Sequence, residues 1–255
     1  MKLDEASLLL ETSADITLGA LEKELSATQV RLPIPSTTPR HRTIAELLSS
    51  PSPADTTPRW GAFVSSCAGI VATLFDGHTE VRTRIAPRKA TGPDWIYAFV
   101  GTENALGTIA SATIRVFRRG EHSELATRRC ASNLDALSAA RSLLQLGARP
   151  TEIVVHAGGL LSVHFEGRAP IVKAELALLE RLAPIPAERS TAIAVETAQA
   201  ISMADLSRWP KAAQQIVGWH LGGAAVVSSF AAKPRAAFSL TFLEDWKKAI
   251  KSEVF

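Results

Sequence analysis

Two runs of β-prone residues, 69–75 and 79–84, flank the dipeptide Asp76-Gly77. An Asp-Gly pair between such runs is the strongest short-range signal of a β-hairpin, because a type I′ turn needs a positive φ at both central residues. The sequence therefore predicts a two-stranded antiparallel unit at this point, and any fold proposed for the chain has to contain an antiparallel sheet.

Backbone-permissive residues gather in the segment that follows, residues 88–117, which read RKATGPDWIYAFVGTENALGTIASATIRVF. Glycine is favoured where the backbone turns left-handed or approaches another group closely. The stretch therefore predicts either tight turns or a backbone wall that faces a ligand. A short helical turn over 94–99 precedes this junction and a strand over 108–117 follows it. The permissive residues are Gly92, Gly101, Asn104 and Gly107.

The first part of the chain predicts a strand over residues 7–11, followed by a helix that Thr17 caps. Leu18, Leu21 and Leu25 fall on one face of that helix. Residues 32–58 are rich in Pro, Ser and Thr, and we expect a long surface excursion there, interrupted by a helical turn over 44–48.

A second pattern begins near Cys130, where Asn133 is expected to cap a helix over 134–146 that ends at Gly147. Strands over 151–155 and 160–167 follow, joined by a turn at 157–159.

The chain then predicts a helix over 171–182, two strands over 224–230 and 236–242, and a closing helix over 243–251. Ile171, Ala174, Leu178 and Leu182 form the expected apolar stripe of the first of these helices. Helices on one face of an antiparallel sheet make an α+β sandwich, with a boundary to the first unit between 118 and 131.

Composition limits the function classes. The chain has 255 residues, of which 46% are hydrophobic, and this suits one large or two small globular domains. A net charge of +3 without a long Lys/Arg block gives no support to a nucleic-acid groove. Cys67 and Cys130 lack metal-ligand spacing, so we expect free thiols in a reducing compartment. The apolar run near the N-terminus is too short for a signal peptide or a membrane span, and we expect a cytoplasmic protein.

The glycine-containing stretch resembles the FAD-linked oxidases of the vanillyl-alcohol-oxidase type, nearest the alkyl-dihydroxyacetonephosphate synthase and glycolate oxidase flavin-subunit branches. The upstream segments LLLETSADITLGALEKEL and GIVATLFDGHTEVRTR are similar to segments of that family in the same order, so the resemblance extends over residues 3–119. Matches to the family motif are Thr91, Gly92, Pro93, Asp94, Gly101, Glu103, Leu106, Gly107, Ile109, Ala112, Thr113 and Arg115.

The resemblance implies an α+β fold in two parts. Residues 1–120 would form a truncated, partial PCMH-type FAD-binding domain, an antiparallel sheet with flanking helices that includes the excursion 32–58. Residues 121–255 would form a ferredoxin-like α+β cap, which in the family is the substrate domain.

The resemblance also assigns cofactor-binding positions, because the glycine turn and the following strand line the FAD pocket in the family. The positions carried over are Gly92, Asp94, Gly101, Thr102, Glu103, Leu106, Gly107 and Ile109. Asn104 and Ala105 stand where the family has glycine and threonine. Asparagine tolerates the left-handed region, so we expect the turn to survive.

Other parts of the family's flavin site are missing or changed. The strand–helix unit with the pyrophosphate loop would precede Met1, and a terminal flavin-proximal segment would follow the last residues. The second glycine-rich segment reads Thr43-Ile44-Ala45-Glu46, which would set a carboxylate near two phosphates at a cost of about 1 kcal/mol. The sequence thus indicates an N-terminally truncated or degenerate member that has lost FAD.

Catalytic residues are not identifiable. The histidines have no i, i+4 spacing of a metal site, and the family's histidine run is absent, while Tyr97, the only tyrosine, lies in the glycine-containing stretch. Cys67 fits a small core residue better than a covalent flavin attachment point. We assign no catalytic residue and no metal ligand. His156 and His164 would face each other across the predicted hairpin only if the register of the two strands places them on the same face of the sheet.

Two functions remain open. In the first, the protein is a pseudoenzyme, a degenerate relative without flavin that acts as a scaffold or partner subunit. In the second, it is an active FAD-dependent oxidoreductase, a 2-hydroxy-acid oxidase or alkyl-glycerone-phosphate-synthase-like enzyme, whose pyrophosphate loop comes from another chain or from an upstream segment. Either way we expect a homo- or hetero-oligomer that covers the missing unit, without nucleic acid or a membrane span.

Overall fold

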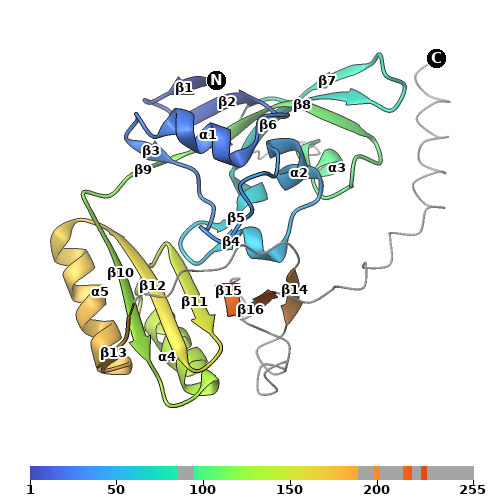
Figure 1. Cartoon of the computed structure of the whole chain (residues 1–255). Coiled ribbons are helices and arrows are strands. Elements are labelled where there is room, and N and C mark those ends of the chain that lie inside the picture. Colours follow the sequence, from blue (N-terminus) through green and yellow to red (C-terminus); the bar gives the residue numbers. More distant parts are fainter. Residues whose placement is uncertain (86–94, 189–197, 202–214, 220–224, 229–255) are drawn as a thin grey trace.

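Two antiparallel sheets organise the residues that the computed structural model describes, namely 1–85, 95–188, 198–201, 215–219 and 225–228 (Figure 1). The first sheet uses strands that end at Arg115, and the second uses strands that begin at His122. Helices pack against both sheets, so the α+β class expected from the sequence is confirmed.

The first sheet has the strand order β1-β2-β8-β6-β7, with every pair antiparallel. Its long central strand β8 pairs with β2 on one side and with β6 on the other, so it joins the N-terminal strands to the hairpin. The strands are β1 (Lys2–Asp4), β2 (Leu9–Ser13), β6 (Cys67–Leu74), β7 (Glu80–Arg82) and β8 (Gly107–Arg115). A separate pair is formed by β3 (Val30–Arg31) and β9 (Phe117–Arg118).

The predicted hairpin is confirmed as β6 and β7, but its turn is not of type I′. Gly77 has a φ of +77°, whereas Asp76 does not adopt a positive φ. The Asp76 carboxylate instead accepts hydrogen bonds from the backbone N–H groups of His78 (2.9 Å) and Thr79 (2.8 Å). The Thr79 hydroxyl also donates to this carboxylate. That hydrogen bond first, and then the two backbone bonds, lower the pKa of Asp76 to about 2. The side chain therefore builds a longer turn, as Asx residues commonly do.

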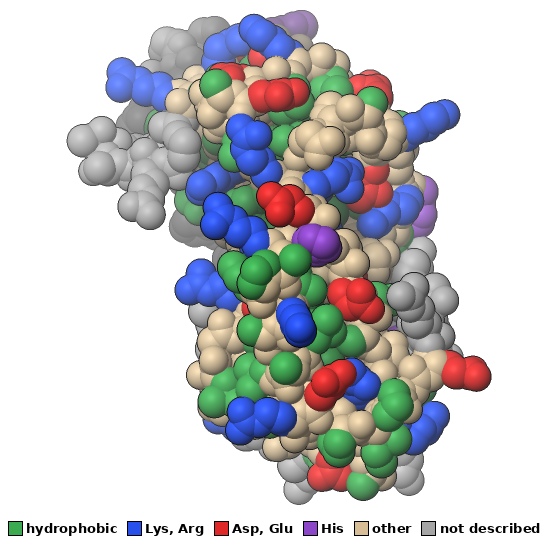
Figure 2. Space-filling model, turned by 90° about the vertical axis from the view of Figure 1, so that its left-hand side faces the viewer, with side chains coloured by type: hydrophobic (Ala, Val, Ile, Leu, Met, Phe, Trp, Pro, Cys, Tyr) green, Lys and Arg blue, Asp and Glu red, His purple; other side chains and the backbone are tan. Residues whose placement is uncertain are grey.

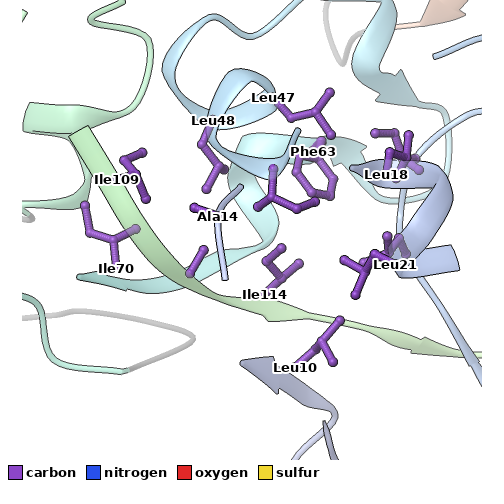
Figure 3. Close-up of a cluster of buried hydrophobic side chains, with 14 of the residues drawn as sticks. Leu10, Ala14, Leu18, Leu21, Leu47, Leu48, Phe63, Ile70, Ile109 and Ile114 are labelled. Atoms are coloured by element: carbon purple, nitrogen blue, oxygen red, sulfur yellow. The ribbon is translucent and has the colours of Figure 1, made fainter. Parts of the chain in front are cut away.

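The core of the first unit lies between this sheet and two helices, α1 (Leu18–Leu25) and α2 (Ile44–Ser49), as Figure 3 shows. Thr17 caps α1 as predicted, its hydroxyl accepting from Ala20 N at 3.3 Å. The leucine face of α1 is fully buried, so this prediction is also confirmed. The side chains labelled in Figure 3 are Leu10, Ala14, Leu18, Leu21, Leu47, Leu48, Phe63, Ile70, Ile109 and Ile114.

Residues 32–58 are not the surface excursion that their composition predicts. Leu32 and Ile34 are at most 3% exposed and belong to the first core. Asp55, 2% exposed, accepts from the Thr38 hydroxyl at 3.1 Å and pairs with Arg42 at 2.8 Å. A buried ion pair with additional hydrogen bonds holds the segment inside, which a count of Pro, Ser and Thr cannot reveal.

Short elements complete this region: the 3₁₀ turns η1 (Pro53–Asp55) and η2 (Phe63–Ser66), the two-stranded pair β4 (Thr56–Thr57) and β5 (Gly61–Ala62), and the short helix α3 (Ile96–Phe99).

The second sheet has the order β13-β10-β12-β11-β15-β16-β14. Its strands are β10 (His122–Arg129), β11 (Glu152–His156), β12 (Leu160–Gly167), β13 (Ile185–Pro186), β14 (Ala198–Ile201), β15 (Gln215–Trp219) and β16 (Ala225–Ser228). The predicted strands around the turn 157–159 correspond to β11 and β12, and β16 lies within the predicted strand 224–230. The strand over 236–242 and the helix over 243–251 fall outside the described residues.

Two helices, α4 (Asn133–Gln145) and α5 (Ala169–Leu182), cover one face of this sheet (Figure 1). Ser132, not Asn133, caps α4, and Asn133 Oδ1 accepts instead from Gly159 N at 2.7 Å. The apolar stripe of α5 is only partly as predicted: Leu178 and Leu182 pack against the core, whereas Ile171 is 55% exposed and the buried residues are Val172 and Leu179. Residue spacing alone places a stripe only to within one position.

Among the described residues, no helix combines the length and the apolar sequence that crossing a bilayer requires.

Candidate functional site

The turn between α3 and β8 carries four of the eight residues that the resemblance assigns to flavin, namely Gly101, Thr102, Glu103 and Leu106. Gly101, Glu103 and Asn104 have φ values of +75°, +51° and +63°. Asn104 thus adopts the left-handed conformation expected of it. Gly92 and Asp94 lie outside the described residues.

The backbone of this turn is hydrogen-bonded to the end of α2. Gly101 N donates to Leu48 O and Glu103 N donates to Ser49 O, both at 2.9 Å. The Thr102 hydroxyl donates to Phe99 O at 2.8 Å. These three donors of the predicted flavin wall are therefore bonded to carbonyl oxygens of the chain itself.

The other predicted positions face the interior of the first unit. Leu106 and Ile109 are each 5% exposed and belong to its core. A Cβ on Gly107 would lie 2.1 Å from Thr73 O, so this residue is glycine because β6 passes close to its backbone. Gly101 and Glu103 are exposed, so the structure divides the predicted residues between the surface and the core.

The segment 43–46, which the resemblance would align with the family's second glycine-rich loop, forms the N-terminus of α2 and is closed by a capping box. Glu46 Oε2 accepts from Thr43 N at 2.8 Å, and the Thr43 hydroxyl accepts from Glu46 N at 3.2 Å. Amide groups that hold a phosphate in other proteins are here satisfied by a threonine and a carboxylate. A second anion at this helix end would meet the negative charge of Glu46, so these residues do not fit a pyrophosphate.

The face of the second sheet opposite its helices is polar and meets the first unit. The Arg31 guanidinium pairs with Glu166 at 2.5 Å, and the Ser36 hydroxyl donates to Glu152 Oε1 at 2.8 Å. Arg59 Nη1 donates to Glu166 O at 2.5 Å. Burial raises the pKa of Glu152, while the hydrogen bonds from Ser36 oppose this shift.

Two histidines of the second sheet, His156 and His164, lie on this polar face, each with its own partner. His164 contacts the Ser123 hydroxyl through Nε2 at 2.7 Å and the Thr151 hydroxyl through Nδ1 at 2.8 Å. His156 Nε2 contacts the Ser162 hydroxyl at 3.3 Å. Burial lowers the pKa of both imidazoles, and for His164 the nearby Arg31 charge adds to this. The two rings share a face without pairing: His164 is opposite Glu152, and His156 is opposite Leu160.

Glu152 and Glu166 were not identified from the sequence as interface residues. The alternation of polar and apolar residues in β12 could have indicated the position of Glu166. Ser162, His164 and Glu166 alternate with apolar residues, which marks one polar face of a buried strand. Within the described ranges no three His, Cys, Asp or Glu side chains form a group that would hold a metal ion. Cys67 and Cys130 form no disulfide with each other, and both are half-buried.

Comparison with proteins of known sequence finds one short similarity and no matching family profile. The chain is 37% identical over 59 residues to the uncharacterized FAD-linked oxidoreductase YgcU of Escherichia coli K12, and equally to that of strain O157:H7. The matched segment is 23% of this chain and 12% of the relative.

Comparison with solved structures finds similar folds over nearly the whole chain. Two crystal forms of alkyldihydroxyacetonephosphate synthase superpose with TM-scores of 0.67 and 0.71, at 14% and 13% identity, over 98% and 99% of this chain. The chain spans 59% and 63% of those proteins. The wild-type BBE-like 1 protein of Physcomitrella patens gives a TM-score of 0.59 at 12% identity, covering 98% of this chain and 68% of the other.

Proposed function

From the premise that this chain has the fold of the FAD-linked oxidases and a segment similar in sequence to one of them, we propose that it is a flavin-free relative that acts as a partner subunit. The observation that carries the proposal is the capping box of α2. Its own Thr43 and Glu46 occupy the helix end that the resemblance would align with the second glycine-rich segment of the family.

The glycine turn supports the same conclusion. A flavin held by backbone groups needs N–H donors that point at the ligand, whereas Gly101 N and Glu103 N are bonded to Leu48 and Ser49. An N–H group that turned toward a flavin would give up its present acceptor. Flavin binding here would therefore break the hydrogen bonds that hold the turn to α2. The turn is thus held by hydrogen bonds to α2, at the place where a flavin-binding protein would use the same N–H groups to hold its cofactor.

A second candidate, a FAD-dependent oxidoreductase, is favoured by a different observation. His164 and Glu152 lie in register on the sheet face that meets the first unit, where the Arg31 and Ser36 side chains reach across. A buried imidazole with a lowered pKa is a common general base. This candidate requires that the flavin be held by residues other than those of the α2 terminus.

The experiment that separates the two is a flavin content measurement. The protein is expressed in a flavin-replete host and purified without added cofactor, and the visible absorption of the protein and of its denatured supernatant is recorded. We expect no flavin band and no change in melting temperature on addition of FAD. A stoichiometric flavin band would reject the proposal and favour the oxidoreductase.

The partner role has its own measurement. Light scattering over a dilution series, followed by affinity capture from the native host with the tagged protein, gives the assembly state and the co-purifying chain. A strictly monomeric protein that captures no stoichiometric partner would contradict the subunit role.

A further inference from the structure

A cavity of about 520 Å³ opens where the two units meet, beside the connection between β9 and β10. Arg59 comes from the first unit and Arg119 from the connection, while Arg149 and Arg168 come from the second unit. Figure 2, which faces the left-hand side of Figure 1, shows Lys and Arg side chains spread over this side of the molecule with acidic side chains among them.

The carboxylates of the described residues only partly balance the charge of these four arginines. None of the four forms an ion pair with a carboxylate of the described residues. Three glutamates also line the cavity, but the charge of Glu166 is offset by Arg31 and its other oxygen accepts from Gly120 N. An excess of positive charge therefore remains in the cavity, with Glu121 and Glu175 as the opposing groups.

Backbone groups add to this potential. The 14-residue helix α5 begins at the cavity wall, and its N-cap residue Arg168 provides no side-chain cap. The first turn of a helix carries a partial positive charge, although in α5 Pro170 has no N–H group and Ile171 N already donates to Arg168 O at 3.0 Å. The Gly147 and Gly167 positions open into the cavity, since a Cβ there would meet no atom within 4 Å. An anion thus has room to approach the backbone.

From the geometry we propose that this cavity binds the phosphate group of a small organic phosphate ester. Guanidinium groups bind phosphate with two parallel hydrogen bonds, which favours arginine over other cations at such sites. Ile171 on the cavity wall is 55% exposed, and it offers an apolar surface to the organic part of the ester. A ligand there would contact both units and tie them together.

This site does not depend on the absence of flavin, because none of its lining residues belongs to the turn 101–107 or to α2. If the protein proves to hold FAD, the same variants still test the cavity.

The test is a calorimetric titration of the full chain with inorganic phosphate, phenyl phosphate and benzoate. We expect both phosphates to bind, phenyl phosphate more tightly, and benzoate to bind more weakly than either. Arg149→Ala with Arg168→Ala should weaken both phosphates by about tenfold or more, because two charge-assisted contacts are lost. Ile171→Ser should weaken phenyl phosphate by several-fold and leave inorganic phosphate unchanged.

The matched control is Arg141→Ala, an exposed arginine of α4 outside the cavity, which should leave all three titrations unchanged. Because Arg149, Arg168 and Ile171 are exposed, their variants should fold. Equal affinity in the wild type and the Arg149→Ala/Arg168→Ala variant would overturn the proposal. So would a preference for benzoate, which indicates a carboxylate site, or no binding of either phosphate at about 10 mM.

Discussion

The carboxylate of Glu166 on β12 forms an ion pair at 2.5 Å with Arg31 on β3, and so joins the two units of the chain. The Glu166 side chain is 7% exposed and that of Arg31 is 20% exposed, so the pair is largely removed from water. The same carboxylate accepts from Gly120 N in the connection between the sheets. One buried side chain thus contacts both the first unit and the connection.

Replacing Arg31 with Met should destabilise the protein by about 3 kcal/mol, because it leaves the Glu166 carboxylate buried without a cation. Urea unfolding monitored by tryptophan fluorescence measures this change. Arg82→Met provides the control, since it removes an ion pair with Glu80 whose side chains are both more than half exposed, and should change stability by less than about 0.5 kcal/mol. Equal effects of the two variants would contradict the role assigned to Arg31.

Thr43→Ala should lower stability by about 1 kcal/mol, because it removes the acceptor for Glu46 N at the start of α2. Glu46→Gln keeps a side-chain acceptor for Thr43 N and should cost less than Thr43→Ala. Thermal unfolding of the two variants measures the difference. If Glu46→Gln also allows FAD to raise the melting temperature, charge rather than geometry excludes the cofactor.

Gly107→Ala should destabilise by roughly 2 kcal/mol or more, since the added methyl would meet Thr73 O at 2.1 Å and force β6 and β8 apart. Gly167→Ala is the comparison, because its Cβ meets open space and the expected change is within about 0.5 kcal/mol. Denaturant midpoints of both variants provide the measurement. A tolerated Gly107→Ala would contradict the packing role assigned to this glycine.

Stability should fall as the pH decreases below 6.5. The pKa values of His156 and His164 are lowered by burial, so below pH 6.5 the unfolded chain binds more protons than the folded one. This loss extends down through the folded pKa values. Glutamine at both positions should flatten the profile in that window, and an unchanged slope in the double variant would assign the dependence to other groups.

Glu152 acts in the opposite direction. Burial raises its pKa above 4.5, so the folded state binds the extra proton, and this contribution to stability is lost as the pH rises from 4.5 through the raised value. Glu152→Gln should remove this slope and leave the histidine slope in place. Unfolding free energies measured from pH 4 to 8 in parallel with the histidine variant separate the two.

Local signals predicted the elements whose stabilising contacts are close in sequence. Thr17 and the leucines of α1 follow a helical period within nine residues, and Asp76-Gly77 joins two strands that pair directly. The sequence placed the α4 cap one residue too late, because Asn133 satisfies Gly159 instead. Boundaries shift where a side chain has a distant partner.

The site was less predictable because its contacts are long-range. Nothing near Arg31 in the sequence indicates that it pairs with Glu166, and the composition of residues 32–58 hides the buried Asp55 network. The glycines and Asn104 predicted a tight turn over 101–107, and Gly101 and Asn104 indeed have positive φ values. Whether that turn faces a ligand depends on Leu48 and Ser49, which bind its N–H groups from another segment.

The central position of β8 has a consequence for synthesis on the ribosome. β1 pairs with β2, but β2 pairs on its inner side with β8, Leu9 being opposite Arg115, so β2 lacks this neighbour until β8 has been translated. At the usual speed of translation this wait lasts roughly 5 to 20 seconds. During that interval the apolar face of β2 and the leucines of α1 are available to chaperones, whereas the β6–β7 hairpin closes as soon as it emerges.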